Sequence, residues 1–561
     1  MHLFEFGPTY PDNLLGRLRR LGSPLAREDR LVDRLVSPIR RPVDRAYYRH
    51  SAKLRELGDL GESAERVQPA ATRKRVLVLS LRMWADHTAY ESVIAHALRL
   101  RGADVTIVTC GGGQPICEVG WGRRIAPRPC DRCAYLTDRV ARAARLPQRR
   151  LADEFEWGSR SDGAPRRAAP SSTVDPAGLA TASVAWFTKS SDPRQTPDGA
   201  AVEADFDVSV AAVAEAFARI LERLDPDVVF ALNGLFAAER AIRHVATERG
   251  VRVVTYEMAP RKDALVFGQA SPAPEMVTDG LAEDQAKRVL SEAENEALDA
   301  LLLARRTGAG AHEQYFDRPL EHDREAVRQA LGLGHATRVV SAFTNLAWDT
   351  ALLGKDIAYD SQFDWLARAS EIVAGQEDSV LVVRVHPAES RWGTAQPVEA
   401  ELRKRLGKLP RSVVLIRPED PVSSYGLLEG SDLVLCYTTT VGLEAAVRGI
   451  PVAVAAQTHY RGRGFTTDIE SHNDMQSVIA RPPAMSAEQV ELARRYAFAF
   501  FFRLMIPFTH VRGEGGRLVR VPFSAEELVP GRDPYLDFVC ERILDGGEFY
   551  LPSTLALPRV A

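Results

Sequence analysis

The chain has 561 residues, too many for one hydrophobic core, and this length predicts about two to four domains. Hydrophobic residues make up 45% of it and charged residues 26%, as in a globular protein, and the formal net charge is −3. This balance excludes a bulk attraction to nucleic acid or anionic lipid, and no apolar run reaches the roughly 20 residues that span a bilayer.

The N-terminal part of the sequence contains no apolar core of signal-peptide length, so we expect a cytoplasmic protein. Residues 1–72 are rich in Arg and Leu and predict a helical extension that packs on the first domain. The alternative is a basic surface that approaches a membrane or a partner.

An α/β domain is predicted over residues 73–330. The continuous apolar run RVLVLSL (75–81) is typical of a strand buried on both faces of a parallel sheet. A helix at 88–102 and a strand at 104–110 complete a βαβ unit. An insertion, partly loop, follows over about 110–200. The later elements expected in this domain are helices at 207–224, 235–249 and 281–306 and strands at 227–232 and 251–257.

A second α/β series is predicted over residues 331–483, followed by a C-terminal helical segment and tail over 484–561. The expected fold class is therefore α/β, with two doubly wound, Rossmann-like domains that face a cleft. The strands expected in the second domain are 338–343, 379–385, 412–416, 432–437 and 451–455.

Polar residues follow three strands of the second domain, where ligands of open α/β sheets bind. Arg384, His386 and Glu389 follow the strand at 379–385, so that Arg384 can grip a phosphate and His386 can donate a hydrogen bond. The alternative for His386 is a histidine whose hydrogen bonds are satisfied in a tight turn.

The second and third clusters follow the next two strands. Thr438, Thr439 and Thr440 occupy a turn before a helix, whose N-terminus suits a phosphate. Ordinary threonine capping is the better explanation of the threonines taken alone, and only the joint pattern with Gly442 and Glu444 favours a ligand. We expect Gly442 to admit a ligand close to the backbone and Glu444 to accept hydrogen bonds from ribose. In the third cluster, THYRGRGF, we expect the loop with Tyr460 and Arg463 to cover the donor, unless it is a solvated basic turn.

The segments HPAE, RPEDPVSSYGLLEGSDLVLCYTTTVGLEAAVRGIPVAV and HYRGRGFT resemble the capsule polysaccharide biosynthesis glycosyltransferases, which include Kdo-transferring enzymes. The resemblance covers about residues 338–470. It implies a GT-B fold, a CMP-, UDP- or GDP-linked sugar donor, and an inverting reaction. Family members typically carry serine and asparagine at the three threonines. The resemblance implies donor binding by His386, Glu389, Ser423, Ser424, Thr439, Thr440 and Glu444.

The catalytic base is then expected in the first domain, because a positioned carboxylate or histidine there can take the proton of an acceptor hydroxyl. Asp86, His87 and Glu91 follow the first strand, and Asp86 is the first choice. A helix N-cap is the alternative role for Asp86. Glu257, at the end of another strand, is a second candidate for the base or for holding the acceptor.

Four of the six cysteines fall in the insertion, spaced C-x6-C-x12-C-x2-C. Such a set can bind a structural zinc ion or an iron–sulfur cluster, and unrelated buried cysteines are the alternative. The four are Cys110, Cys117, Cys130 and Cys133.

The function expected is transfer of a sugar from a nucleotide sugar to a surface polysaccharide or a lipid-linked acceptor. The Arg-rich N-terminus and residues 498–508 suggest peripheral membrane contact, and no nucleic-acid partner is expected. Three alternatives remain: a nucleotide-sugar 2-epimerase, a polyol-phosphate transferase, and a non-catalytic binding subunit. Retention of His386, Glu389 and Glu444 argues against the binding subunit.

Overall fold

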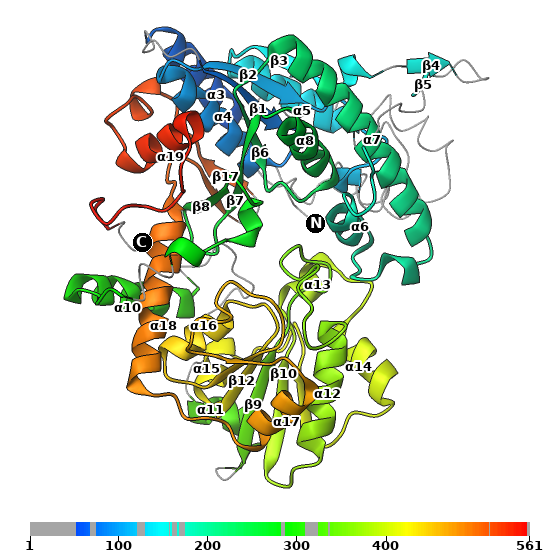
Figure 1. The fold of residues 1–561 in the computed structure, drawn as a ribbon, viewed down its shortest axis with the longest axis vertical. Coiled ribbons are helices and arrows are strands. Elements are labelled where there is room, and N and C mark those ends of the chain that lie inside the picture. Colours follow the sequence, from blue (N-terminus) through cyan, green and yellow to red (C-terminus); the bar gives the residue numbers. More distant parts are fainter. Residues whose placement is uncertain are drawn as a thin grey trace.

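The protein folds into two α/β bodies, one above the other in Figure 1, each built on its own sheet. The two doubly wound domains expected from the sequence are therefore confirmed. This computed structural model describes residues 52–67, 74–120, 130–155, 157–159, 165–167, 174–281, 287–308, 324–334, 337–514 and 517–557.

The first sheet has the strand order β15-β8-β7-β6-β1-β2-β3. Five neighbouring strands of this sheet run parallel: β7, β6, β1, β2 and β3. Strands β8 and β15 are antiparallel to their neighbours. The chain order reverses between β1 and β6, which makes this the topological switch point. The strands are β1 (Arg75–Ser80), β2 (Asp104–Thr109), β3 (Gln148–Arg150), β6 (Val228–Leu232), β7 (Arg252–Met258), β8 (Ala264–Gly268) and β15 (Ile506–Pro507).

Both faces of this sheet are covered, which explains the unbroken apolar run of β1. Val76 and Val78 pack in one core with α3, α4, α5 and α19, whereas Leu77 and Leu79 pack in another with α6, α7 and α8. The helices are α3 (Ala52–Glu65), α4 (Ala85–Leu100), α5 (Cys130–Ala143), α6 (Thr181–Thr188), α7 (Gly199–Leu224), α8 (Ala237–Glu248) and α19 (Pro534–Asp545).

The second sheet has the order β11-β10-β9-β12-β13-β14 and is parallel throughout. Its switch point lies between β9 and β12. The strands are β9 (Arg338–Phe343), β10 (Ser379–Arg384), β11 (Val413–Ile416), β12 (Leu433–Cys436), β13 (Val452–Val454) and β14 (Thr467–Asp468). The helices are α11 (Arg324–Ala330), α12 (Gln362–Ala374), α13 (Ala388–Trp392), α14 (Val398–Leu406), α15 (Ser424–Glu429), α16 (Val441–Val447) and α17 (His472–Ala480).

The C-terminal segment does not form a separate unit. Helix α18 (Ala487–Ala499) packs on α16 and continues as a π-helical turn (Phe500–Leu504). The chain then adds β15 to the first sheet, and α19 packs on α4. The helical part of the expected segment thus ends at Leu504, because Ile506 and Pro507 pair with β8.

Within its described residues, the insertion at 110–200 has more regular structure than expected, since it supplies α5, α6 and the edge strand β3. The helix expected at 281–306 appears as α10 (Glu292–Arg306), which begins after a capping box at Ser291. Of the expected N-terminal extension, α3 lies within the described residues and is helical.

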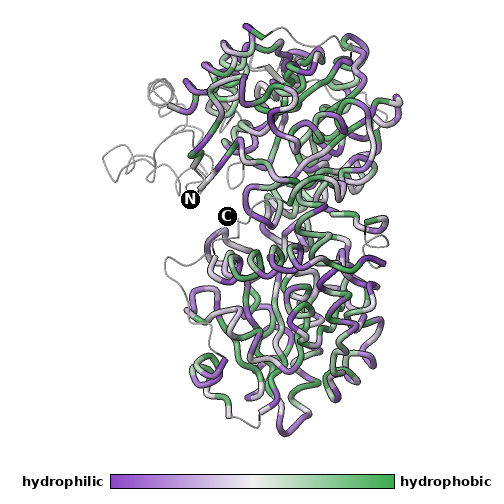
Figure 2. The backbone as a smooth tube through the Cα atoms, turned by 90° about the vertical axis from the view of Figure 1, so that its left-hand side faces the viewer, coloured by the Kyte–Doolittle hydropathy of each residue, from purple (hydrophilic) through white to green (hydrophobic). Residues whose placement is uncertain are grey.

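Green, hydrophobic stretches run through the middle of both bodies in Figure 2, and purple, hydrophilic stretches lie mainly at their margins. Within the described residues, no helix is both long and apolar enough to cross a membrane. The residues expected to contact a membrane, 498–508, are instead packed inside the protein: Phe500, Phe501 and Phe502 are fully buried. They hold α18 against the second domain and cannot reach a lipid surface.

Candidate functional site

The switch point of the second sheet brings together the residues that follow β9 and β12. The Thr438 amide donates to Asn345 Oδ1 at 3.5 Å, and Asn345 is itself held by Gln362. Thr438 is 9% exposed, and its hydroxyl has no hydrogen-bond partner among the residues that the structure describes. A buried hydroxyl without a partner costs free energy, so this atom marks a place suited to a ligand.

His386 lies at the tip of the neighbouring strand, as predicted. Its amide donates to Thr344 Oγ1 at 3.0 Å, and its Nδ1 accepts from the Ala388 amide at 3.1 Å. Burial lowers the pKa of His386 to about 4, so the ring is neutral near pH 7. With Nδ1 as acceptor, a neutral ring carries its proton on Nε2 and can donate from there.

Glu389 stands one turn further along the chain, in α13. Both of its carboxylate oxygens accept from the Val398 amide at 3.3 Å. Burial raises the pKa of Glu389 to about 7. The carboxylate therefore ties α13 to the start of α14 and fixes the loop between them.

Arg384, Ser423 and Ser424 have internal roles in the structure. Arg384 is 2% exposed and donates to Ser424 Oγ at 3.2 Å and to the Arg417 carbonyl at 2.8 Å. Ser423 caps α15 by accepting from the Gly426 amide at 3.1 Å. The phosphate fork expected of Arg384 is thus used to join β10 to the segment before α15.

The threonine turn and Gly442 differ from expectation. Thr440 is the N-cap of α16 but its side chain makes no capping bond, whereas Thr439 Oγ1 accepts from the Val441 amide at 3.4 Å. A Cβ at Gly442 would lie 2.3 Å from Tyr460 Oη. Gly442 therefore makes room for Tyr460, which is fully buried and donates to the Thr439 carbonyl at 2.7 Å, and not for a ligand.

We expect Gly442→Ala to destabilise the protein by about 1–3 kcal/mol, the usual cost of overpacking a core. The added methyl would overlap the Tyr460 ring, which has no free space to move into. Urea unfolding measures the change. Gly280→Ala is the control, because a Cβ there meets nothing within 4 Å, and an equal effect of both variants would contradict the interpretation.

Glu444 is not available to a ribose in this structure. It is 1% exposed, and Arg305 at the end of α10 donates to its Oε1 at 2.9 and 3.2 Å. Tyr425 donates to its Oε2 at 3.0 Å. The carboxylate thus compensates the charge of a buried arginine of α10, a role that the sequence alone did not suggest.

The glycine-rich loop after β13 carries a histidine that the predicted site left out. His459 stacks on Phe500 at 3.9 Å between ring centroids, and its Nδ1 lies 2.9 Å from Tyr496 Oη. Its Nε2 has no partner among the described residues, and burial lowers the pKa of His459 to about 3. Arg463, expected to cover the donor, instead bonds Thr278 and Asp279.

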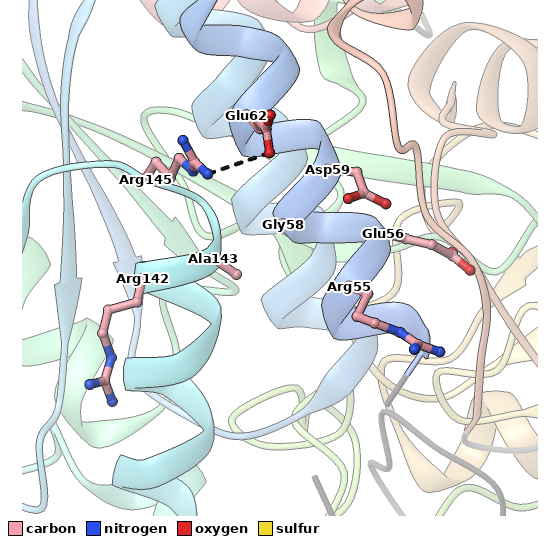
Figure 3. Close-up of a pocket in the computed structure, with 8 residues that line it drawn as sticks. All are labelled: Arg55, Glu56, Gly58, Asp59, Glu62, Arg142, Ala143 and Arg145. Atoms are coloured by element: carbon pink, nitrogen blue, oxygen red, sulfur yellow. Dashed lines mark ion pairs between the residues drawn. The ribbon is translucent and has the colours of Figure 1, made fainter. Parts of the chain in front are cut away.

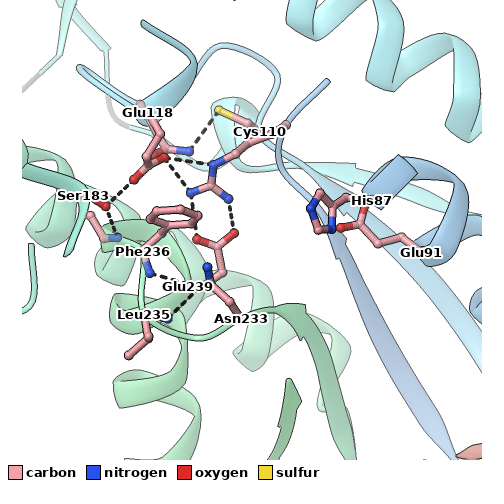
Figure 4. A network of polar contacts seen from close by, with 12 residues as sticks. His87, Glu91, Cys110, Glu118, Ser183, Asn233, Leu235, Phe236 and Glu239 are labelled. Atoms are coloured by element: carbon pink, nitrogen blue, oxygen red, sulfur yellow. Dashed lines mark hydrogen bonds and ion pairs between the residues drawn. The ribbon is translucent and has the colours of Figure 1, made fainter. Parts of the chain in front are cut away.

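A buried ion cluster lies at the switch point of the first sheet. Arg82, just past β1, is 4% exposed and donates to Glu118 Oε2 at 2.7 and 2.9 Å and to both oxygens of Glu239. Burial by itself would lower the pKa of Arg82, but the two carboxylates raise it well above its ordinary value. Ser183 extends the network by donating to Glu118 and accepting from the Ala237 amide (Figure 4).

Asp86 lies beside the C-terminal hairpin of β16 (Arg512–Glu514) and β17 (Arg517–Arg520). A Cβ at Gly513 would lie 2.4 Å from Asp86 Oδ2, so the carboxylate is packed against that backbone. Asp86 is 8% exposed, and Trp84, not Asp86, is the N-cap of α4. The capping role weighed for Asp86 is therefore wrong.

His87 and Glu91 are joined through Tyr256 of β7. The Tyr256 hydroxyl lies 3.3 Å from His87 Nδ1 and donates to Glu91 Oε1 at 3.0 Å. Burial raises the pKa of Glu91 to about 8. Tyr256 is fully buried, so this group mainly links α4 to the sheet.

Glu257 stands at the end of β7, near residues of the other domain. Asn233 hydrogen-bonds its carboxylate, and the Met258 amide donates to it at 2.9 Å. Burial raises the pKa of Glu257 to about 7, and the negative charge of Asp349, from the loop after β9, adds to this rise. A carboxylate with this pKa at the domain boundary suits general base catalysis near neutral pH.

Within the described residues, the structure does not bring Cys110, Cys117 and Cys133 together as a metal site. Cys110 is a buried thiol, Cys117 and Cys133 are half-buried thiols, and Gln114 donates to Cys110 Sγ at 3.5 Å. The Cys130 side chain lies outside the described part of the chain. No group of three or more metal-binding side chains occurs within the described residues. A four-cysteine metal centre stays a prediction, which elemental analysis of anaerobically purified protein tests.

A surface pocket of about 610 Å³ lies between α3 and α5 (Figure 3). It is lined by charged side chains of both signs, and Arg145 pairs with Glu62 at 3.5 Å across it. None of the residues predicted to bind the donor or to catalyse the reaction lines it.

The second domain matches a family of known proteins. The match covers residues 358–500, and the family is described as capsule polysaccharide biosynthesis protein. Over these residues the chain is similar to that family. The resemblance expected from the sequence is thereby confirmed, and the matched region contains His386, Thr438 and His459.

The solved structures that match the chain have low identity and low TM-scores. KpsC of Thermosulfurimonas dismutans, a beta Kdo 2,7 transferase, is 14% identical with a TM-score of 0.32, over 56% of this chain and 88% of that one. The UDP-GlcNAc 2-epimerase of Neisseria meningitidis is 11% identical with a TM-score of 0.24, over 77% of this chain and 99% of that one. No curated protein matches the chain.

Proposed function

We propose that the protein is a glycosyltransferase that moves a sugar from a nucleotide-sugar donor to a glycan or lipid-linked acceptor in surface polysaccharide synthesis. The donor binds the carboxyl edge of the second sheet, beside Thr438, Asn345 and His386. The acceptor binds the facing edge of the first sheet, where Glu257 takes the proton from its hydroxyl. The family match of the second domain supports this assignment.

The observation that carries the proposal is the buried Thr438 hydroxyl at the β9–β12 switch point. Open α/β sheets bind ligands at such points, and a phosphate oxygen would accept the hydrogen bond that this hydroxyl cannot make within the described residues. His386, with its proton on Nε2, supplies a second donor one strand away. Arg384 and Glu444 are left out of this set because their side chains hold other parts of the protein together.

We expect Thr438→Val to weaken nucleotide binding by about 10- to 150-fold, which corresponds to loss of a hydrogen bond to a charged group. The stability of the unliganded protein should not fall, because valine removes a hydroxyl that has no described partner. Calorimetry with CMP, UDP and GDP measures the affinity. Thr307→Val, on an exposed residue that ends α10, is the control. Equal affinity of Thr438→Val and the control would remove Thr438 from the site.

A nucleotide-sugar 2-epimerase remains a second candidate, since it would use the same edge of the second sheet. The two activities differ in their need for an acceptor. We expect nucleotide release from the donor to require an added glycan or glycolipid acceptor. Conversion of the nucleotide sugar without any acceptor would favour the epimerase.

A further inference from the structure

The two domains meet at a seam that the proposed chemistry does not use. It joins the turn after α6 in the first domain to the loop after β9 and the loop between α13 and α14 in the second. The interdomain seam consists of Trp186, Lys189 and Ser191 on one side and Trp348, Ala395 and Gln396 on the other.

The side chain of Lys189 is held between two indole rings, one from each domain. Its Nζ lies 3.6 Å from the centroid of the Trp186 ring and 3.7 Å from that of Trp348. The two rings meet edge to face with centroids 6.3 Å apart. Lys189 is only 4% exposed, and burial lowers its pKa to about 7, although Asp349 acts in the opposite direction. Rings of both domains therefore contribute to the burial of the Lys189 amino group.

The backbone of the turn reinforces this contact. Lys189 has a left-handed conformation, with φ of 56°, unusual for a residue with a side chain. Its carbonyl accepts from the Ala395 amide at 2.8 Å. Two residues on, the amide and hydroxyl of Ser191 both donate to Gln396 Oε1, at 2.8 and 2.9 Å. Strained local geometry of this kind persists where surrounding contacts hold it.

The seam is also connected to the residues of the candidate site. Trp348 donates from Nε1 to the Gly393 carbonyl at 3.1 Å. The next residue is Asp349, whose negative charge contributes to the raised pKa of Glu257. The loop at 393–397 leads into Val398, whose amide holds Glu389. When the turn is docked, it therefore contacts both the loop that joins α13 to α14 and the loop after β9.

We propose that the interdomain seam is a latch: the turn at 189–191 docks on Trp348 and the 394–396 loop when the two domains close, and undocks as one unit when they open. The latch requires that a change on one side loosens the other side. This inference concerns the closing of the domains and holds whatever the donor is.

Hydrogen exchange of the full-length protein, resolved at single amides by mass spectrometry, tests the latch. In Trp348→Ala we expect the Ser191 amide, in the other domain, to exchange at least about 10-fold faster, because exchange there requires the seam to open. In Ser191→Ala we expect the same of the Ala395 amide, again across the boundary. Strands β1 and β12 should keep their protection in both variants.

Ser390→Ala is the matched control, because Ser390 lies in α13 but its hydroxyl donates only locally, to the Pro387 carbonyl at 3.4 Å. Unchanged exchange at Ser191 in Trp348→Ala, with both sheets still protected, would overturn the latch. If Trp348→Ala loses the protection of β12, Ser191→Ala decides alone, and unchanged exchange at Ala395 would then overturn it.

Discussion

Replacing Glu257 by Gln is expected to lower the turnover of sugar transfer by about 100- to 10,000-fold, the usual contribution of a positioned general base. Glutamine keeps the size of the side chain and can still bond Asn233, but it cannot accept a proton. Nucleotide affinity should not change, because the donor residues lie in the other domain. Steady-state kinetics with a saturating donor measure the effect.

The same assignment predicts a pH dependence. A general base acts in its deprotonated form, so kcat/KM should rise with pH through about 7, the raised pKa of Glu257, and level off above it. Glu275→Gln, at an exposed residue of the same domain, should keep full activity. Asp86→Asn is the competing variant: if it alone loses turnover, Asp86 is the base and Glu257 is not.

Replacing Glu444 by Ala is expected to lower the free energy of unfolding by about 3–5 kcal/mol, because it leaves the buried Arg305 charge without its partner. The side chains of Arg305 and Glu444 are 10% and 1% exposed, so water cannot compensate the loss. Urea denaturation followed by circular dichroism measures it. Loss of nucleotide affinity in a variant of unchanged stability would show instead that Glu444 binds the donor.

Glu429→Ala is the matched control for this prediction. Glu429 pairs with Arg306, the next residue of α10, but both side chains are nearly 30% exposed. Such pairs contribute at most about 1 kcal/mol. The double variant Arg305→Met/Glu444→Met should recover most of the stability, since apolar replacement of a buried ion pair is often neutral.

The sequence predicted most of the parallel strands, because a buried parallel strand is a continuous apolar run, but it missed the short edge strands β3 and β14. The expected range for β9 is the observed one, and those for β1 and β2 are one residue too long. The return of the chain to the first domain was not predictable in this way. Strand β15 has two residues, too few to leave a pattern, and its partner β8 is far away in sequence.

The candidate site was only partly predictable, for a related reason. Position after a strand identified His386 and Thr438, since strand ends define the edge of the sheet. It also selected Glu444, which instead pairs with Arg305. The two residues are 139 positions apart in the sequence, so no local pattern could predict their ion pair. Lys189 and Asp349 were missed because they contribute through contacts between domains.

The most direct test of the account is the hydrogen-exchange footprint of a bound nucleotide on the wild-type protein. Titration with CMP, UDP and GDP first identifies the one that binds, and exchange is then compared with and without it at saturation. We predict slower exchange at residues 344–348, 385–389 and 437–440 and no change at 81–84 and 233–236, which follow strands of the first sheet. Protection confined to the first domain, or no binding of any of the three, would contradict a nucleotide-sugar donor at the carboxyl edge of the second sheet.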